Sequence, residues 1–191
     1  VNLDQAISYC TQKGDGWHLM TRAEWAAIAL WCKANGCLPK GNNNYGKDAS
    51  EGGYKAIPAP GVNDSGRTAR VLTGTGPVSW SHDGTLEGIW DLNGNIWEWN
   101  GGSRTVKGEL QVLVNNNAAD LDHSQAASSA QWKAIDATTG AYITPNGSGT
   151  TANSIKLDWV SGKITYSATI TTQADASRDC AFASVTCASS V

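Results

Sequence analysis

The chain has 191 residues, of which 40% are hydrophobic and 16% are charged, and its formal net charge is −3. That length is sufficient for one domain with a hydrophobic core, and the 21 glycines indicate many turns. No run of about 18 apolar residues is present, which argues against a membrane span. The basic residues are scattered, which argues against a nucleic-acid interface, since such an interface needs a clustered basic face.

Two capping boxes predict two helices near the start of the chain. Asn2 and Gln5 are spaced as the cap of a first helix, and Thr21 and Glu24 as the cap of a second. The second helix is expected over residues 23–33, with a left-handed stop at Asn35-Gly36. Residues 17–20 between them are expected to form a short buried strand or an extended entry to the second helix. At helical spacing, the first apolar face holds Leu3, Ala6, Ile7 and Cys10, and the second holds Trp25, Ile28, Ala29 and Cys32.

Residues 40–70 are predicted to be a long loop region, rich in glycine and containing two prolines. Its asparagine-rich run, residues 41–48, could ligate calcium through side-chain oxygens, because hard cations take oxygen donors. Only Asp48 and Glu51 offer negative charge nearby, so turns are the favoured interpretation. Short strands are expected at residues 71–72 and 78–80, followed by a turn with a solvated His82.

The stretch over residues 88–102 organises the prediction for the rest of the chain. Asn93-Gly94 predicts a two-residue hairpin turn, because both positions accept positive φ. The runs on either side alternate as strands do, which places Trp97 and Trp99 on one face. Both tryptophans are therefore expected to be buried, and replacing either by alanine to cost roughly 3–5 kcal/mol.

Later segments are predicted by alternation and by turn residues. One or two strands are expected over residues 104–114, broken at Lys107-Gly108, and a short helix over residues 124–135. Residues 155–159 and 163–170 alternate on either side of Ser161-Gly162, which predicts a second hairpin.

Five cysteines allow two small disulfide loops, Cys180–Cys187 and Cys32–Cys37, and leave Cys10 as a small core residue. The C-x2-C spacing of zinc sites is absent, so we expect no metal site and no cofactor. No serine or cysteine lies at a recognisable nucleophile elbow, so no catalytic residue is assigned.

Two blocks carry a family resemblance. The sequences W-H-L-M-T-R-A-E-W (residues 17–25) and G-I-W-D-L-N-G-N-I-W-E-W (residues 88–99) resemble proteins with the C-type-lectin fold. The resemblance is to the formylglycine-generating enzymes and to the variable ligand-binding proteins of diversity-generating retroelements, and it covers about residues 1–120. It implies one α+β domain over residues 1–191, with two helices, an antiparallel sheet and long loops; residues 121–191 would be a hairpin-rich extension or insertion. The framework residues implied by the resemblance are Trp17, Glu24, Trp25, Trp90, Asn93, Gly94, Asn95, Trp97 and Trp99.

The chain departs from both groups at its end. Their C-terminal block resembles R-G-G-x-W followed by G-F-R, and it carries the variable contacts or the active-site cysteines; nothing after Trp159 matches it. The chain could be a fragment, the block could be a separate chain, or the tail could have diverged. A start at Val1 without methionine and the abrupt end at Val191 favour a fragment of a larger protein.

The resemblance therefore predicts a non-enzymatic domain that displays a surface to a host receptor, another protein or a glycan. We expect a phage tail, a virion or a cell surface as its location, as a homo-oligomer or within a larger assembly. The alternatives are a structural decoration domain and a formylglycine-generating-type copper oxidase, for which Cys180 and Cys187 are the late thiol candidates. Calcium-dependent sugar binding is not supported, because the E-P-N and Q-P-D tripeptides are absent.

Overall fold

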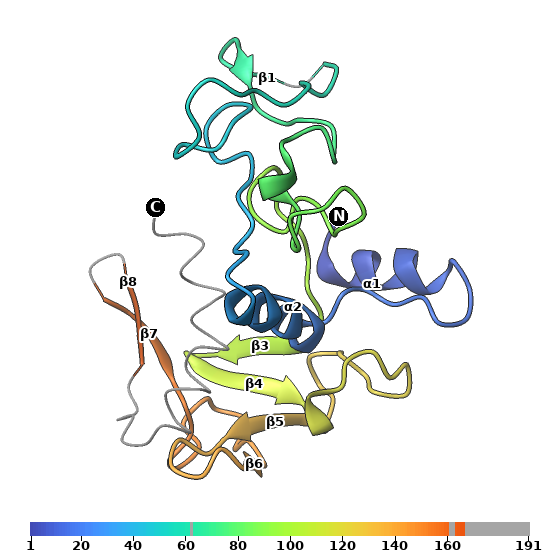
Figure 1. The fold of residues 1–191 in the computed structure, drawn as a ribbon. Helices are drawn as coiled ribbons and strands as arrows, with labels where there is room; N and C mark the ends of the chain where they lie inside the picture. The colour runs from blue at the N-terminus through green and yellow to red at the C-terminus, as the bar shows by residue number, and fades with distance from the viewer. Residues whose placement is uncertain (62, 161–162, 167–191) are drawn as a thin grey trace. The chain divides into compact units, whose positions relative to one another are not determined.

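The computed structural model describes residues 1–61, 63–160 and 163–166 (Figure 1), with the backbone alone at 157–160 and 163–166. It contains two α-helices and three small antiparallel sheets, which is the predicted α+β class. The chain divides into two compact units. The first, here called the sheet unit, comprises residues 1–26 and the chain from residue 99 onward; the second, the loop unit, comprises residues 27–98. Among the described residues, no helix combines the length and the apolar character needed to cross a bilayer.

Helix α1 spans Leu3–Thr11 and begins at the predicted capping box. Asn2 Oδ1 accepts from the Gln5 amide at 2.9 Å, and Gln5 Oε1 accepts from the Asn2 amide at 3.0 Å. The apolar face predicted for this helix is half-buried along its length, and no residue of α1 is fully buried.

Helix α2 spans Arg22–Ala34, and the cap predicted from the sequence is confirmed. Thr21 Oγ1 accepts from the Glu24 amide at 3.1 Å, and the Glu24 carboxylate accepts from the Thr21 amide at 2.8 Å. Gly36 ends the helix with a φ of +69°, as the Asn-Gly stop predicted. Cys32 is the one fully buried residue of α2.

Of the two alternatives for residues 17–20, the strand does not form. Gly101 donates its amide to the Met20 carbonyl and pairs with Thr21 in a single bridge, so no ladder extends along the segment. Trp17 is 55% exposed, with Lys13 Nζ 4.7 Å from its ring centroid, which corrects the expectation of a buried Trp17.

The loop unit contains little regular structure. Strands β1 (Asn63–Asp64) and β2 (Arg67–Thr68) form a two-residue ladder, and the predicted loop region over residues 40–70 is otherwise irregular. Val78–Trp80 is a 3-10 helix rather than a strand, because Pro77 precedes it and accepts from the Trp80 amide. Val71 makes one bridge to Pro58, so the strand expected at residues 71–72 is also absent. The core here is Ala56, Val71 and Trp80, with Trp90 packed against it.

The hairpin predicted over residues 88–99 is wrong. Gly94 has the expected positive φ (75°), but the other positive values fall on Asp91 (59°) and Asn95 (65°) instead of on Asn93, and the flanking runs have no mutual ladder. Their backbone groups bond outside the stretch: the Ile89 carbonyl accepts from His82, and the Asn95 amide donates to Asn42. These two backbone groups are therefore bonded to other segments instead of to each other's run.

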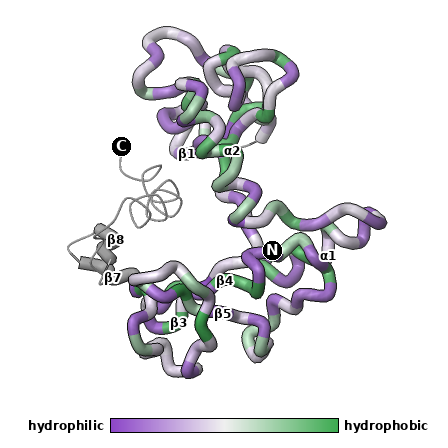
Figure 2. Tube along the Cα trace, turned by 60° about the horizontal axis from the view of Figure 1, so that its bottom comes forward, coloured by the Kyte–Doolittle hydropathy of each residue, from purple (hydrophilic) through white to green (hydrophobic). Residues whose placement is uncertain are grey.

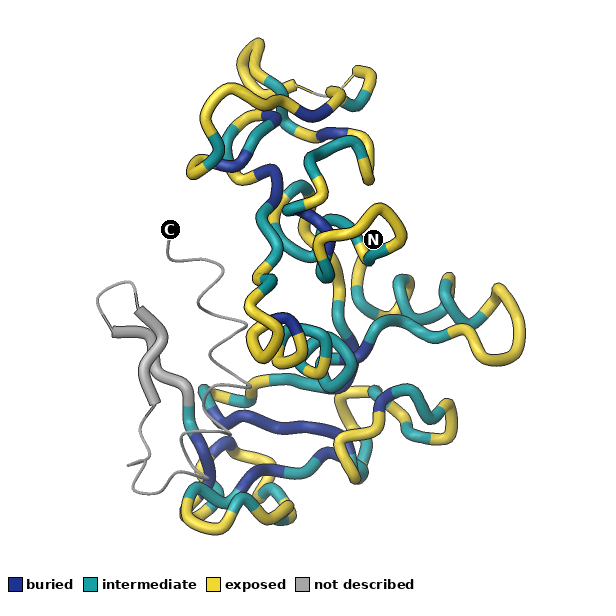
Figure 3. The backbone as a smooth tube through the Cα atoms, in the orientation of Figure 1, coloured by how far each residue is buried: buried dark blue, intermediate teal, exposed yellow. Residues whose placement is uncertain are grey.

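The sheet unit is built around four antiparallel strands in the order β3-β4-β5-β6. Every residue of the interior strand β4 is buried, as Figure 3 shows, so both faces of this strand are covered. Figure 2 shows hydrophobic and hydrophilic residues mixed along these strands. Leu110, Val112, Ile135 and Ile155 form one buried cluster, while Leu113, Ala118 and Trp132 form another. The strands are β3 (Ser103–Val106), β4 (Glu109–Leu113), β5 (Trp132–Ile135) and β6 (Tyr142–Ile143).

One or two strands broken at Lys107-Gly108 were predicted, and the structure has two, β3 and β4. The helix predicted over residues 124–135 is wrong. Gln131 donates its amide to Ser129 Oγ, and its carbonyl accepts from the Val114 amide, so neither of its backbone groups makes the i→i−4 bond of a helix. A four-residue strand, β5, follows.

The second predicted hairpin is confirmed over the residues that the structure describes. Strand β7 (Leu157–Val160) pairs antiparallel with β8 (Lys163–Tyr166), and Trp159 lies opposite Ile164. Its turn at 161–162 and the part of the predicted strand beyond residue 166 lie outside the described residues.

Candidate functional site

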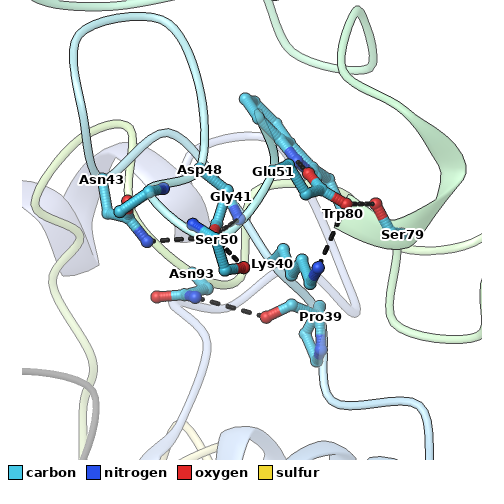
Figure 4. Close-up of polar contacts among 11 residues, drawn as sticks. Pro39, Lys40, Gly41, Asn43, Asp48, Ser50, Glu51, Ser79, Trp80 and Asn93 are labelled. Carbon is cyan, nitrogen blue, oxygen red and sulfur yellow. Dashed lines mark hydrogen bonds and ion pairs between the residues drawn. The ribbon is translucent and has the colours of Figure 1, made fainter. Parts of the chain in front are cut away.

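Asp48 organises the asparagine-rich loop, as Figure 4 shows. Its buried carboxylate accepts from the Gly41 amide (3.3 Å) and Asn43 Nδ2 (2.8 Å) on one oxygen. The other oxygen accepts from the Ser50 amide (2.8 Å) and the Ser50 hydroxyl (2.6 Å). Burial alone would raise the pKa of Asp48, but the hydrogen bonds from Ser50, Gly41 and Asn43 outweigh it and lower the pKa. Four donors thus hold an ionised carboxylate at the centre of the loop.

Glu51 ties the same loop to the core of the loop unit (Figure 4). One oxygen accepts from the Ser79 hydroxyl at 2.6 Å and lies 3.4 Å from Lys40 Nζ, and the other accepts from Trp80 Nε1 at 2.8 Å. Burial opposes the ionisation of Glu51, yet these bonds and the Lys40 charge lower its pKa. Glu51 therefore satisfies the indole N–H of a tryptophan that is only 1% exposed.

The Asn95 side chain bonds both backbone groups of Val71, as a neighbouring strand would. Its Oδ1 accepts from the Val71 amide at 2.9 Å and its Nδ2 donates to the Val71 carbonyl at 3.2 Å, so one amide side chain satisfies both backbone groups. The same Nδ2 lies 3.3 Å from Asp91 Oδ2, and the Asn95 amide donates to Asn42. Asn95 thereby joins the 88–99 stretch to both ends of the loop region.

Asn93 and Gly94 complete this clamp, defined as Asn93, Gly94 and Asn95 bound to the backbone of residues 39–42 and 71. Asn93 Nδ2 donates to the Pro39 carbonyl at 3.2 Å (Figure 4). A Cβ built on Gly94 would lie 2.7 Å from the Asn42 carbonyl oxygen, and one built on Gly41 would lie 1.7 Å from the Asn93 carbonyl oxygen. Two backbones approach so closely at this point that only glycine fits on either side.

The other residues of the predicted framework do not form one cluster. Trp90 lies in the loop unit, half-buried against the core, with its Nε1 donating to the Leu86 carbonyl. Trp97 belongs to the loop unit and is fully exposed, at 102%. Trp99 belongs to the sheet unit, is 49% exposed and donates to the Val1 carbonyl. The expectation that both are buried is therefore wrong, because the strand ladder that would have turned them onto a core does not form.

Glu24 and Trp25 lie in the sheet unit, where Trp25 is half-buried. Besides closing the cap of α2, Glu24 contacts His18 Nε2 at 2.8 Å. Burial opposes the ionisation of Glu24, but the hydrogen bonds from Thr21 and His18 outweigh it and lower the pKa. The role of Glu24 in this structure is to order the start of the helix.

The histidines have structural partners. His82, expected as a solvated turn residue, is half-buried: its Nδ1 accepts from the Ile89 amide at 2.9 Å, and its ring centroid lies 5.2 Å from that of Trp31. His123 contacts the Asn117 carbonyl through Nδ1. Within the described part of the chain, no three histidine, cysteine or acidic side chains are placed to hold a metal ion together.

Cys32 and Cys37 are thiols in this structure, so the disulfide considered between them is not formed. Cys10, expected in a core, is half-buried and is also a thiol. Cys180 and Cys187 lie outside the described residues.

Sequence reasoning missed Glu109, which is 0% exposed on the interior strand. Its carboxylate accepts from Gln111 Nε2, the Thr151 amide and the Ser154 hydroxyl, each at 2.8 Å. Strand alternation alone would place a glutamate toward solvent. The run Glu-Leu-Gln-Val-Leu alternates in this way, so it carries no local signal for the burial of Glu109.

In comparisons with known proteins, no family matches the chain. No curated protein matches it either.

Proposed function

We propose that the chain is a non-enzymatic display domain, in which a C-type-lectin-like framework holds a loop surface toward a host receptor, another protein or a glycan. The proposal places it on a phage tail, a virion or a cell surface, as a homo-oligomer or in a larger assembly. The resemblance at residues 17–25 and 88–99 suggests the framework.

The observation that carries the proposal is the pairing of a fixed loop region with an unburied tryptophan. The clamp and the two carboxylates of Asp48 and Glu51 fix the loop, so its backbone is ordered before any ligand arrives. Two residues after Asn95, Trp97 exposes its whole side chain. A rigid scaffold with exposed aromatic side chains is the arrangement that binding surfaces use, because preorganisation reduces the entropy lost on binding.

The carboxylates support a binding role over a catalytic one. Each oxygen of Asp48 and of Glu51 accepts at least one hydrogen bond from the protein, and both groups have lowered pKa values. A general acid at neutral pH needs a raised pKa and access to substrate, and these groups have a lowered pKa and lie within the fold.

A binding screen tests the proposal. The labelled chain is applied to a panel of bacterial strains by flow cytometry and to a glycan array. We expect saturable binding to a subset, with about a thirtyfold loss of affinity in Trp97→Ala, as for an aromatic hot spot. Tyr142→Ala, which removes an exposed aromatic of the sheet unit, is the matched control and should bind like the parent chain.

The same variant addresses the structural alternative. An exposed tryptophan also suits a contact between subunits of a decoration protein, since large exposed apolar groups mark association sites. If no strain or glycan binds and sedimentation shows assembly that Trp97→Ala abolishes, the decoration function replaces the display function. Stoichiometric copper binding that is lost in a Cys180→Ser/Cys187→Ser variant would instead support the oxidase alternative.

A further inference from the structure

The C-terminal end of α2 brings two cysteines into contact. The Cys37 amide donates to the Cys32 carbonyl at 3.0 Å, the Gly36 amide donates to the Lys33 carbonyl at 3.3 Å, and Gly36 has a φ of +69°. These two bonds and the left-handed glycine define a Schellman motif. In that motif the side chains at the positions of Cys32 and Cys37 characteristically meet, usually as an apolar contact. Here both are thiols, and Cys37 Sγ lies 3.7 Å from the Cys32 carbonyl oxygen.

The two thiols differ in access. Cys32 is 1% exposed, whereas Cys37 is half-buried and can be reached from solvent. Burial raises the pKa of the Cys32 thiol, and the neighbouring Cys37 raises it further. Cys37 is therefore the thiol that an external reagent meets first.

The Cys32 thiol also holds a second segment of the loop unit. Its Sγ donates to the His82 carbonyl at 3.2 Å. His82 in turn donates its amide to the Ile89 carbonyl and accepts from the Ile89 amide through Nδ1, which closes residues 82–89 into a loop. The Trp31 ring, one residue before Cys32, packs beside the His82 ring.

We propose that Cys32 and Cys37 are a reversible dithiol–disulfide pair, and that its oxidation by a low-molecular-weight disulfide releases the 82–89 loop from α2. The Schellman motif brings the two side chains together. The hydrogen bond from Cys32 Sγ to the His82 carbonyl couples the oxidation state of Cys32 to the 82–89 loop. This inference does not depend on the display function.

The reaction is two successive thiol–disulfide exchanges. The Cys37 thiolate attacks one sulfur of the oxidant, forming a mixed disulfide and expelling one small thiolate. The Cys32 thiolate then attacks the Cys37 sulfur, forming the Cys32–Cys37 bond and expelling the second small thiolate. The two protein protons end on the two released thiols, so the dithiol is oxidised and the oxidant is reduced by two electrons. Once its sulfur is bonded to Cys37, Cys32 has no S–H to donate to His82.

The test uses the 191-residue chain with Cys10, Cys180 and Cys187 replaced by serine, treated with oxidised glutathione. Mass spectrometry should find a Cys32–Cys37 linkage that dithiothreitol reverses. Hydrogen exchange at the His82 and Ile89 amides should become about fivefold faster in the oxidised form, the effect of losing one hydrogen bond. If the triple variant does not fold, the linked peptide and the two amides are followed in the unmodified chain.

Two variants separate the steps. In Cys32→Ser a mixed disulfide should persist at Cys37, whereas Cys32→Ala should reproduce the faster exchange at His82 and Ile89 without any oxidant. The proposal is overturned by a mixed disulfide at Cys37 that never resolves while Cys32 is present. It is equally overturned by a Cys32–Cys37 bond that leaves exchange at His82 and Ile89 unchanged.

Discussion

The sheet unit and the loop unit satisfy their backbones in different ways. In the sheet unit, β4 pairs with β3 and β5, and its five residues are all buried. In the loop unit, side chains bond the backbone groups. Asn95 bonds both backbone groups of Val71, Asn42 accepts from the Gly46 amide, and Asp48 accepts from the Gly41 amide. A long irregular segment can thus be fixed without strands, provided that short amide and carboxylate side chains supply the missing partners.

Both units nevertheless bury an acidic side chain that accepts several hydrogen bonds. Amide and hydroxyl groups supply the hydrogen bonds that Asp48 and Glu109 accept. Hydrogen bonding to the ionised form compensates for its desolvation. The two units therefore differ in how their backbones are hydrogen-bonded. They do not differ in polarity, since both have polar groups in their interiors.

The strongest way to break the loop unit is to remove its largest buried side chain. Trp80→Ala should cost about 3–5 kcal/mol, because it leaves a cavity and deprives Glu51 of a donor. Hydrogen exchange should show lost protection at loop-unit amides such as Ala56 and Leu72. Equal protection in the variant and the parent would contradict the assignment of Trp80 to the core.

The clamp predicts a penalty at Gly94 beyond ordinary left-handed strain. Gly94→Val should cost about 3 kcal/mol or more, since it combines a φ of +75° with a Cβ 2.7 Å from the Asn42 carbonyl oxygen. Gly84→Val is the matched control: its φ is +76°, but no atom lies within 4 Å of the added Cβ, so about 1–2 kcal/mol is expected. Denaturant unfolding of both measures the difference, and equal costs would show that the close approach is absent in solution.

Glu109 tests the sheet unit in the same way. Glu109→Ala leaves the Gln111, Thr151 and Ser154 donors without their acceptor and should cost about 2 kcal/mol. The lost protection should fall on sheet-unit amides such as Leu110 and Ile155. Glu87→Ala, at an exposed position, should change the free energy of unfolding by less than about 0.5 kcal/mol. Loss of protection throughout the loop unit would refute a local role for Glu109.

The elements that the sequence predicted correctly depend on neighbours a few residues apart. Both capping boxes, the Gly36 stop and the break at Lys107-Gly108 follow from residues within one turn of each other. Asn93-Gly94 also has a strong local turn pattern, yet the hairpin does not form. The Asn95 backbone amide bonds Asn42, and the Asn95 side chain bonds Val71. Those partners lie 53 and 24 residues away, a separation that no local pattern encodes. The same limit hid Glu109, whose acceptor role depends on Ser154 and Thr151.

A pH titration of Asp136 tests the hydrogen bonds at an exposed turn of the sheet unit. Backbone and side-chain hydrogen bonds from Thr139, together with Asn153, lower the pKa of Asp136 from 3.8 to about 2. Because the folded pKa lies below the unfolded value, this contribution to stability is present above pH 3.8 and is lost as the pH falls toward 2. NMR titration of the Asp136 carboxyl should show that midpoint, and Asn153→Ala should raise it. A midpoint near 3.8 in the parent chain would contradict the turn geometry.

The smallest effect on stability is expected at Trp97, and it distinguishes the two surfaces that Trp97 could form. Because its side chain is 102% exposed, Trp97→Ala should change the free energy of unfolding by less than about 0.5 kcal/mol. Unfolding is measured at two protein concentrations well apart. If Trp97 lies between copies of the chain, the substitution destabilises the concentrated sample more than the dilute one, because association stabilises the native state by mass action. If Trp97 contacts an external ligand, neither sample changes and only binding falls. A loss of 3–5 kcal/mol at both concentrations would mean that Trp97 packs within its own chain, which the exposed side chain contradicts.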